Sequence, residues 1–154
     1  MRRLIALLCV SYCGLAVAAG GLPDAQRTHG AINPNVTQAN IDQTICVKGF
    51  TKTIRPPANY TNALKKKQIK QYRYADKKPA DYEEDHLVPL ETGGHPTDPK
   101  NLWPQPRKGQ WNAAKKDRLE NVMHQRVCSG QMTLAAAQVL ISNNWVAAYK
   151  SYVK

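Results

Sequence analysis

The feature that most constrains the fold is a series of polar residues and glycines near the middle of the 154-residue chain. Asp85 and His86 are followed by Gly93-Gly94, a pair that accepts positive φ without steric cost and therefore favours a turn. Asn101 comes fifteen positions after His86, which allows a returning strand to bring its amide back against the first strand. These spacings predict a β hairpin over residues 82–104.

A helix is expected to follow the hairpin, over residues 112–127. Asn112 stands at its start, where an asparagine either caps the helix or offers a carbonyl oxygen to a cation. The face that packs on the core is predicted by apolar residues at helical spacing, Leu119, Val122, Met123 and Val127. The expected unit is therefore strand, turn, strand and helix.

Phosphodiester hydrolysis would use these residue types together. The reaction needs a base that activates water and a cation that neutralises charge on the phosphate. His86 suits the base, because an unperturbed imidazole exchanges protons near neutral pH. Neighbouring side chains of an extended segment point to opposite sides, so Asp85 can bind a metal while His86 addresses the water. Lys115 and Lys116, one turn into the helix, are placed to meet the phosphate.

At these residues the chain resembles the HNH, or ββα-metal, endonuclease family, over roughly residues 82–124. The resemblance is carried by Asp85-His86, Gly93-Gly94, Asn101-Leu102 and Asn112-x-x-Lys115. It implies an α+β fold with a ββα-metal (HNH-like) hairpin-plus-helix core and additional helices on both sides. It also implies that His86 is the general base, that Asn101 positions it, and that Asp85 and Asn112 bind one divalent metal. The implied activity is cleavage of DNA, with RNA as an alternative.

Two features depart from the pattern of that family. Many members have the last ligand about two positions nearer the middle asparagine, where this chain has Gln110, so Glu120 and His124 remain alternatives to Asn112. Glu120 and His124 are four positions apart and share a helix face, which an exposed polar pair also explains. Members with a structural zinc carry two Cys-x-x-Cys pairs, which this chain lacks, so a structural zinc is not expected.

The expected cofactor is one divalent metal. Mg²⁺ is the first choice for oxygen ligands, and Mn²⁺, Ni²⁺ or Zn²⁺ are alternatives where a histidine lies nearby. Two other classes of function remain open. One is a non-catalytic nucleic-acid-binding module with the same fold, and the other is a cationic protein that binds surface polyanions or membranes.

The charge of the chain favours a polyanionic partner. The formal net charge is +11, and about +9 without Arg2 and Arg3. Basic residues that we expect to contact the nucleic-acid backbone precede the motif or open its helix: Lys65, Lys66, Lys67, Lys70, Arg73, Lys115 and Lys116. A solvated basic helix face is the simpler alternative. Phosphate contacts carry no sequence information, so little sequence specificity is expected.

The N-terminus predicts a secretory signal peptide over residues 1–19. Arg2 and Arg3 precede an apolar run, and small residues end it at Ala18. The run is shorter than the ~20 residues that span a bilayer. We therefore expect a secreted or periplasmic protein that has no stable membrane anchor after cleavage. The sequence leaves the oligomeric state open.

Cys46 and Cys128 are the two cysteines that remain after this segment. An even number in an oxidising compartment favours a disulfide between them, with two buried free thiols as the alternative.

The rest of the chain is divided by its turn residues. Residues 20–44 are expected to form a flexible N-terminal segment, and residues 45–154 the HNH-like nuclease domain. Within that domain we expect strand pieces and helices outside the motif, with Thr133 as the cap of the first C-terminal helix. The strand pieces are residues 45–47 and 50–54, and the helices are residues 61–72, 134–141 and 145–152.

Overall fold

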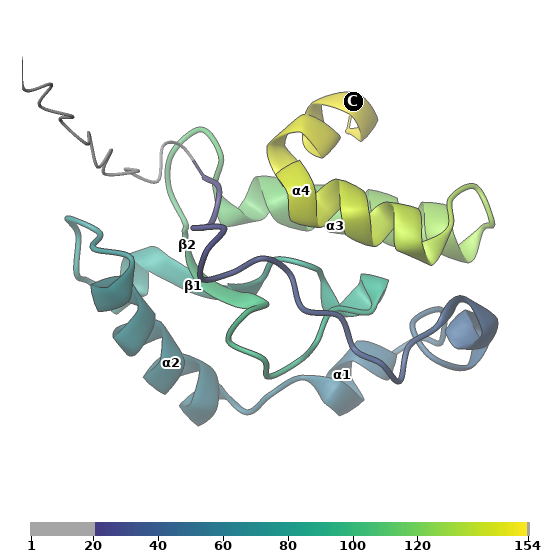
Figure 1. The fold of residues 1–154 in the computed structure, drawn as a ribbon, viewed down its shortest axis with the longest axis horizontal. Coiled ribbons are helices and arrows are strands. Elements are labelled where there is room, and N and C mark those ends of the chain that lie inside the picture. Colours follow the sequence, from purple (N-terminus) through teal and green to yellow (C-terminus); the bar gives the residue numbers. More distant parts are fainter. Residues whose placement is uncertain (1–20, 154) are drawn as a thin grey trace, which may run out of the picture.

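The computed structural model describes residues 21–153, so the predicted signal peptide lies outside the described residues. The chain combines helices with one antiparallel pair of strands, which confirms the α+β class (Figure 1). The elements are η1 (Gln38–Gln43), α1 (Phe50–Ile54), α2 (Ala58–Gln71), η2 (Pro79–Asp81), β1 (Tyr82–His86), η3 (Leu90–Thr92), β2 (Leu102–Pro106), α3 (Ala113–Cys128) and α4 (Leu134–Tyr152), where η marks a 3-10 helix.

β1 and β2 form the predicted hairpin. Tyr82 lies opposite Pro106, and His86 lies opposite Leu102. The strands are joined by the long loop of residues 87–101, which contains η3, so Gly93-Gly94 turns the chain inside this loop and does not close the hairpin directly.

The hairpin lies between α2 and the paired helices α3 and α4 (Figure 1). On the α2 side, Gln68 donates to Leu102 O at 2.9 Å. On the α3 side, Lys116 contacts Asp85. Successive side chains of a strand point to opposite faces, so neighbouring residues of β1 face opposite sides of the hairpin.

The core lies chiefly between α3 and α4. Leu119, Met123 and Val127 of α3 are buried, as the helical spacing predicted, whereas Val122 is only half-buried. The three buried residues belong to the same hydrophobic cluster as Ile141 and Trp145 of α4. Since a helix of this kind gains most of its stability by burying such a face, the face fixes how α3 is rotated and therefore where its polar residues point.

The expected break between two C-terminal helices is a local irregularity within α4. Thr133 caps the helix, because its side chain accepts a hydrogen bond from the backbone of Ala136 at 3.2 Å. Asn144 departs from helical geometry (φ −164°, ψ 87°), and its side chain caps the next turn by accepting from the backbone of Ala147 at 2.9 Å.

The prediction of strands over residues 45–47 and 50–54 is wrong. Residues 50–54 form the short helix α1, which begins after Gly49 in the left-handed region (φ 90°). Val47 is exposed, and no strand lies beside these residues within 21–153. Isolated β-type residues stay out of strands where no neighbouring strand offers backbone partners.

The segment of residues 21–44 follows a mostly irregular path against the rest of the chain. Val36 and Ile41 are buried in the hydrophobic core, and Ile32 forms an isolated β-bridge with Gly94. The domain boundary at residue 45 stays a prediction. Within residues 21–153, no helix has the length and apolar character needed to cross a membrane.

Candidate active site at the end of the hairpin

Asp85 and His86 lie at the end of β1, and both are buried. Asp85 Oδ1 accepts a hydrogen bond from the His86 backbone at 2.8 Å, while Asp85 Oδ2 lies 2.9 Å from Lys116 Nζ on α3. The His86 ring contacts the connecting loop, where its Nε2 lies 2.9 Å from Pro96 O. The two side chains therefore contact different parts of the protein, as the extended backbone predicted.

The surroundings of His86 favour a neutral imidazole. Burial lowers the pKa of His86, and the hydrogen bond to Pro96 O and the charge of Asp85 oppose this effect only in part. A carbonyl oxygen only accepts hydrogen bonds, so Nε2 carries the proton and Nδ1 of the neutral ring keeps a lone pair. The side chain thus has the protonation state that a general base needs.

Asn101 holds the loop against which His86 lies. It is fully buried, its Oδ1 accepts from Val88 N at 2.9 Å, and its Nδ2 donates to Val88 O at 2.9 Å and to His95 O at 3.0 Å. His95 is the neighbour of Pro96, whose carbonyl oxygen binds the His86 ring. Asn101 therefore reaches His86 through the loop backbone.

The loop closes tightly at Gly94. A Cβ atom at this position would lie 1.8 Å from Val88 O and 2.8 Å from Asn101 Nδ2. Gly93 before it has a φ of 75°, in the left-handed region. Gly94 is therefore required because the backbone of Val88 approaches it closely, and Gly93 because of its positive φ.

Lys116 takes a different place from the surface position that the sequence suggested. Its side chain is completely buried, and its ammonium lies 2.9 Å from Asp85 Oδ2, donates to His86 O at 2.6 Å and forms an ion pair with Glu120 one turn further along α3. The hairpin and the helix are thus joined by one internal cation. A contact between Lys116 and a phosphate stays a prediction, and it would require the side chain to leave this position.

The two carboxylates keep Lys116 protonated. Burial alone would lower the pKa of Lys116, but the charges of Asp85 and Glu120 outweigh it and raise the pKa above its ordinary value. Burial raises the pKa of Glu120, and the charge of Lys116 opposes this shift. Positive charge is therefore a permanent part of this junction near neutral pH.

Asn112 is the N-cap of α3, as predicted. Its Oδ1 accepts from the backbone of Lys115 at 3.1 Å, and its Nδ2 donates to Gly109 O at 3.1 Å. The Lys115 ammonium lies 4.9 Å from the centroid of the Trp111 ring. Asn112 and Lys116 are four positions apart along α3, and Lys116 is the one of the two that contacts Asp85.

These donors fit a hard divalent cation in their chemistry. Asp85 Oδ2 is buried and, within residues 21–153, makes an ion pair but no well-directed hydrogen bond, and the Asn112 carbonyl has a second lone pair. Lys116 is the competitor, because its ammonium already neutralises Asp85. The structure thus brings Asp85 and His86 together, whereas Asn112 makes the hydrogen bonds of the α3 cap, and its role as a metal ligand stays a prediction.

Two charged residues beside this site gave no recognisable signal in the sequence. Arg55, which follows α1, is exposed. Burial is the largest cause of the lowered pKa of His86, and the positive charge of Arg55 lowers this pKa further. Glu91 of η3 has a pKa raised by burial, which the charges of His124, Lys116 and Arg55 oppose. Arg55 and Glu91 come close to this site because α1 packs against η3, and a motif within one segment does not predict that packing.

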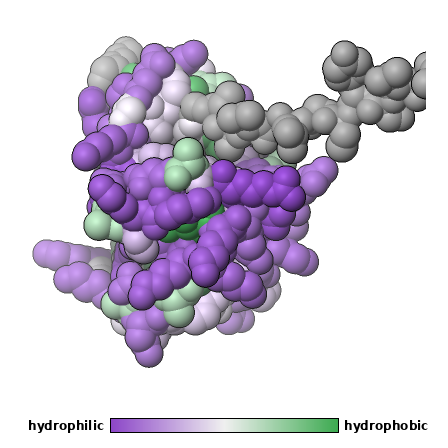
Figure 2. All heavy atoms as spheres, turned by 90° about the vertical axis from the view of Figure 1, so that its left-hand side faces the viewer, coloured by the Kyte–Doolittle hydropathy of each residue, from purple (hydrophilic) through white to green (hydrophobic). Residues whose placement is uncertain are grey.

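The basic residues of α2 are mostly exposed. Lys66, Lys67 and Lys70 reach solvent, whereas Lys65 is half-buried and donates to Tyr82 O at 3.2 Å. Hydrophilic side chains cover most of this side of the molecule, the left-hand side of Figure 1 (Figure 2).

The tyrosines next to these lysines are engaged with one another. The rings of Tyr74 and Tyr82 stack with centroids 5.1 Å apart, and Tyr72 lies 5.4 Å from Tyr74. The Tyr72 hydroxyl donates to Thr28 Oγ1 at 2.6 Å. Base stacking on Tyr72 or Tyr74 would therefore compete with contacts inside the protein.

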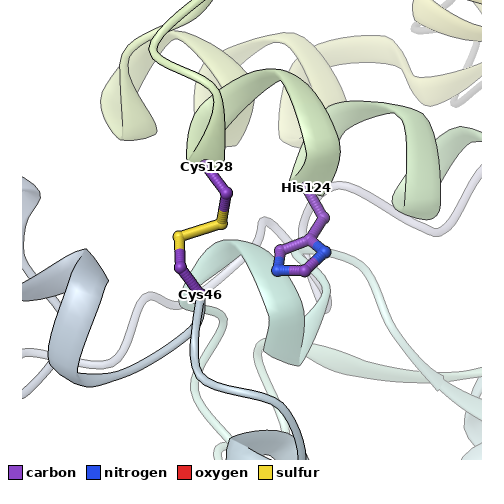
Figure 3. Close-up of side chains that lie close together, drawn as sticks. All are labelled: Cys46, His124 and Cys128. Atoms are coloured by element: carbon purple, nitrogen blue, oxygen red, sulfur yellow. A yellow bond between two sulfur atoms is a disulfide. The ribbon is translucent and has the colours of Figure 1, made fainter.

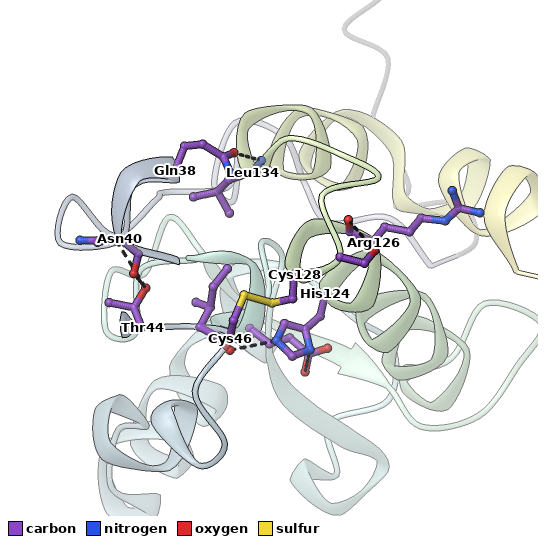
Figure 4. Close-up of a disulfide and its surroundings, with 11 residues drawn as sticks. Gln38, Asn40, Thr44, Cys46, His124, Arg126, Cys128 and Leu134 are labelled. Carbon is purple, nitrogen blue, oxygen red and sulfur yellow. Dashed lines mark hydrogen bonds and ion pairs between the residues drawn. A yellow bond between two sulfur atoms is a disulfide. The ribbon is translucent and has the colours of Figure 1, made fainter. Parts of the chain in front are cut away.

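Cys46 and Cys128 form the predicted disulfide (Figure 3). It joins the segment after η1 to the last residue of α3. His124 lies beside it and contacts Ile45 O through Nε2 at 2.9 Å (Figure 4). The free-thiol alternative is therefore excluded for this structure.

A scan against protein-family models finds no match to this chain, and neither do searches of the curated proteins and of the solved structures. Its function is therefore argued from the geometry of the site.

Proposed function

We propose that this protein is an HNH-type metal-dependent endonuclease that hydrolyses phosphodiester bonds in DNA, with RNA as a second substrate. The observation that carries the proposal is the arrangement around His86. A buried imidazole, held through Nε2 so that Nδ1 keeps its lone pair, lies next to a buried carboxylate at the end of a hairpin, and the loop that holds the ring is fastened by Asn101. This is the arrangement a water-activating base requires.

In the proposed reaction His86 takes a proton from water at Nδ1, and Asn101 keeps the ring in place through the loop. Asp85 and Asn112 would hold a divalent cation, with Mg²⁺ the first choice and Mn²⁺, Ni²⁺ or Zn²⁺ the alternatives. Such an ion supplies charge neutralisation at the scissile phosphate when bound. Lys116 would have to release Asp85 for that purpose, and the same ammonium is then close enough to the site to meet the phosphate.

The exposed cations support a nucleic-acid substrate. Lys66, Lys67, Lys70 and Arg73 lie on and just after α2, on the opposite side of the hairpin from α3. Contacts of this kind bind the backbone of any sequence, so the proposed enzyme has little sequence specificity. We also propose that the protein is exported, because of its N-terminal sequence and because its disulfide suits an oxidising compartment.

A second candidate is a nucleic-acid-binding module without catalysis. The observation that favours it is the ion pair between Lys116 and Asp85, which already neutralises the proposed metal ligand. On this alternative the chain binds DNA or other surface polyanions through its basic face, and added metal has no effect.

Cleavage of supercoiled plasmid by the purified, oxidised protein tests the proposal. Mg²⁺, Mn²⁺, Ni²⁺, Zn²⁺ or EDTA is added in turn, and His86→Ala is compared with His29→Ala, which removes an exposed histidine elsewhere. We expect metal-dependent nicking that His86→Ala abolishes and His29→Ala keeps, while a gel-shift assay shows that both variants still bind DNA. Nicking by His86→Ala at the wild-type rate overturns the mechanism. DNA binding without nicking under any metal favours the binding module.

A further inference from the structure

A second cluster of reactive side chains lies at the other end of α3. Cys46, His124 and Cys128 offer ligand atoms that all lie within 4.8 Å of one another (Figure 3). His124 and Cys128 are one helical turn apart and share a face of α3, and Cys46 reaches them from the segment after η1. With a rise of about 1.5 Å per residue, the length of α3 separates this cluster from Asn112 by roughly 20 Å.

The imidazole of His124 lies between a backbone carbonyl and a carboxylate. Its Nε2, the ring nitrogen on the Cys46 side, lies 2.9 Å from Ile45 O (Figure 4). Its Nδ1 lies 4.0 Å from a carboxylate oxygen of Glu91. Histidines that bind a metal through one nitrogen commonly present the other N–H to a carboxylate, which fixes the tautomer and the ring.

We propose that reduction of the Cys46–Cys128 disulfide converts this cluster into a site for a thiophilic divalent cation, represented by Zn²⁺. Two thiolates and one imidazole form a ligand set typical of zinc, which prefers four nitrogen and sulfur ligands in tetrahedral geometry. His124 Nε2 gives up its hydrogen bond to Ile45 O, its proton moves to Nδ1 through solvent, Nε2 then binds the ion, and Nδ1–H faces Glu91. Because all three side chains are half-buried, a water molecule can complete the coordination.

The conversion balances with a dithiol as reductant. The dithiol supplies two electrons and two protons, the Cys46–Cys128 bond breaks to give two thiols, and the reductant closes to its own disulfide. Binding of Zn²⁺ then releases both thiol protons to solvent. In the oxidised protein neither sulfur is a thiolate, so the site exists only after reduction.

The cation would replace a covalent link by a coordinate one between the same two segments. Because the ion binds the folded arrangement of the three ligands, its binding free energy stabilises the reduced fold. None of these residues belongs to the proposed nuclease set of Asp85, His86, Asn101 and Asn112, so the inference does not rest on the proposed function. His124, which the sequence left as an alternative to Asn112, lies beside the disulfide.

Cobalt is the probe for this site, because thiolate ligation to Co²⁺ gives charge-transfer absorption in the near ultraviolet and tetrahedral Co²⁺ gives intense visible bands. The full chain carries Cys9→Ser and Cys13→Ser, so that Cys46 and Cys128 supply the only thiols. The protein is reduced with a dithiol, freed of reductant under nitrogen and titrated with Co²⁺. We expect both absorptions in the reduced protein and neither in the oxidised one, and Zn²⁺ should displace the cobalt.

His124→Gln tests the geometry, with His29→Gln as the matched control at an exposed histidine. We expect His124→Gln to weaken Zn²⁺ binding at least about tenfold, and His29→Gln to leave it unchanged. Absence of the bands in reduced protein overturns the inference, as does equal binding by the His124→Gln and control variants. If reduction alone unfolds the chain, recovery of the helical circular dichroism on adding Zn²⁺ supports the site, and failure to recover overturns it. Plasmid nicking with Mg²⁺ is measured in a separate assay. Because Mg²⁺ gives no thiolate absorption, the two assays report on the two proposed sites independently.

Discussion

Lys116 Nζ lies 2.9 Å from Asp85 Oδ2, at the centre of a junction from which the lysine side chain has no access to solvent. Lysine is among the residues least often buried completely, and it stays charged there only because carboxylates surround it. The junction between β1 and α3 is therefore a cation site that the protein fills with its own ammonium group. Any external cation must exchange with that group.

Replacement of this lysine should make the fold depend on divalent metal. Lys116→Met leaves Asp85 and Glu120 buried without a cation, so we expect unfolding free energy in EDTA to fall by about 3–5 kcal/mol. Mg²⁺ or Ca²⁺ should restore part of the loss, because either ion can bind the two carboxylates. Urea denaturation with and without metal measures both effects. Lys67→Met, at an exposed position of α2, is the control. A variant as stable as wild type in EDTA would show that the ion pair contributes nothing.

Asn101 should matter for stability as well as for cleavage. Asn101→Ala leaves Val88 N and Val88 O buried without partners, and we expect a loss of about 1–3 kcal/mol in unfolding free energy. Cleavage should fall further than the loss of folded protein explains, because the loop no longer holds His86. Asn121→Ala removes an exposed amide that bonds only to its own helix, and it should change stability by less than about 0.5 kcal/mol. Equal effects of the two substitutions would contradict this role for Asn101.

Glu84 should make the fold less stable as the pH rises. Both of its carboxylate oxygens are buried and find no hydrogen-bond partner among residues 21–153, and burial raises its pKa to about 8, with Lys65 opposing. Between an unfolded pKa of about 4.5 and the folded value, the folded protein binds the proton and the unfolded chain has lost it, so stability decreases with pH across this window.

Glu84→Gln removes that dependence. Its stability relative to wild type should therefore rise from pH 5 to pH 8, by up to about 4 kcal/mol in total. The measurement is urea denaturation in EDTA at several pH values. Glu83→Gln, which breaks an exposed ion pair with Arg107, is the control and should cost less than about 1 kcal/mol. A pH-independent difference between Glu84→Gln and wild type would refute the assignment.

The exposed lysines of α2 should set the salt dependence of DNA binding. Lys66→Gln with Lys67→Gln should reduce the slope of log affinity against log salt by about 0.9 for each phosphate contact that is lost. Lys48→Gln with Lys52→Gln removes the same charge from exposed positions outside α2 and should change the slope less. Fluorescence anisotropy with duplex DNA at several salt concentrations gives both slopes. Identical slopes for the two double variants would show that the α2 lysines do not form the DNA-binding face.

The elements that the sequence predicted correctly depend on local rules. Strand pairing around Asn101, the cap at Asn112 and the apolar face of α3 follow from spacing and from backbone hydrogen-bonding needs. The Cys46–Cys128 bond follows from the number of cysteines. Each of these predictions needs only a few residues of one segment or, for the disulfide, an even number of cysteines.

The elements that were missed depend on tertiary partners. Lysines usually lie at the surface, so the neighbouring sequence does not predict that the Lys116 side chain is buried against two carboxylates. Residues 50–54 have strand-forming side chains but form a helical turn after Gly49, because no strand of the described part of the chain, residues 21–153, lies beside them. Arg55 reaches the site through the packing of α1 beside η3, which has no signature within either segment.

The disulfide closes a covalent ring that contains both strands and the whole of α3. A protease that cuts between α2 and η2, at residues 73–78, would open this ring without releasing a fragment, so the catalytic candidates would stay on one molecule. A cut at residues 129–133 falls outside the ring and would leave α4 attached only by its packing. If the protein is exported, as proposed, an extracellular protease that cuts this short connection could therefore remove part of the core.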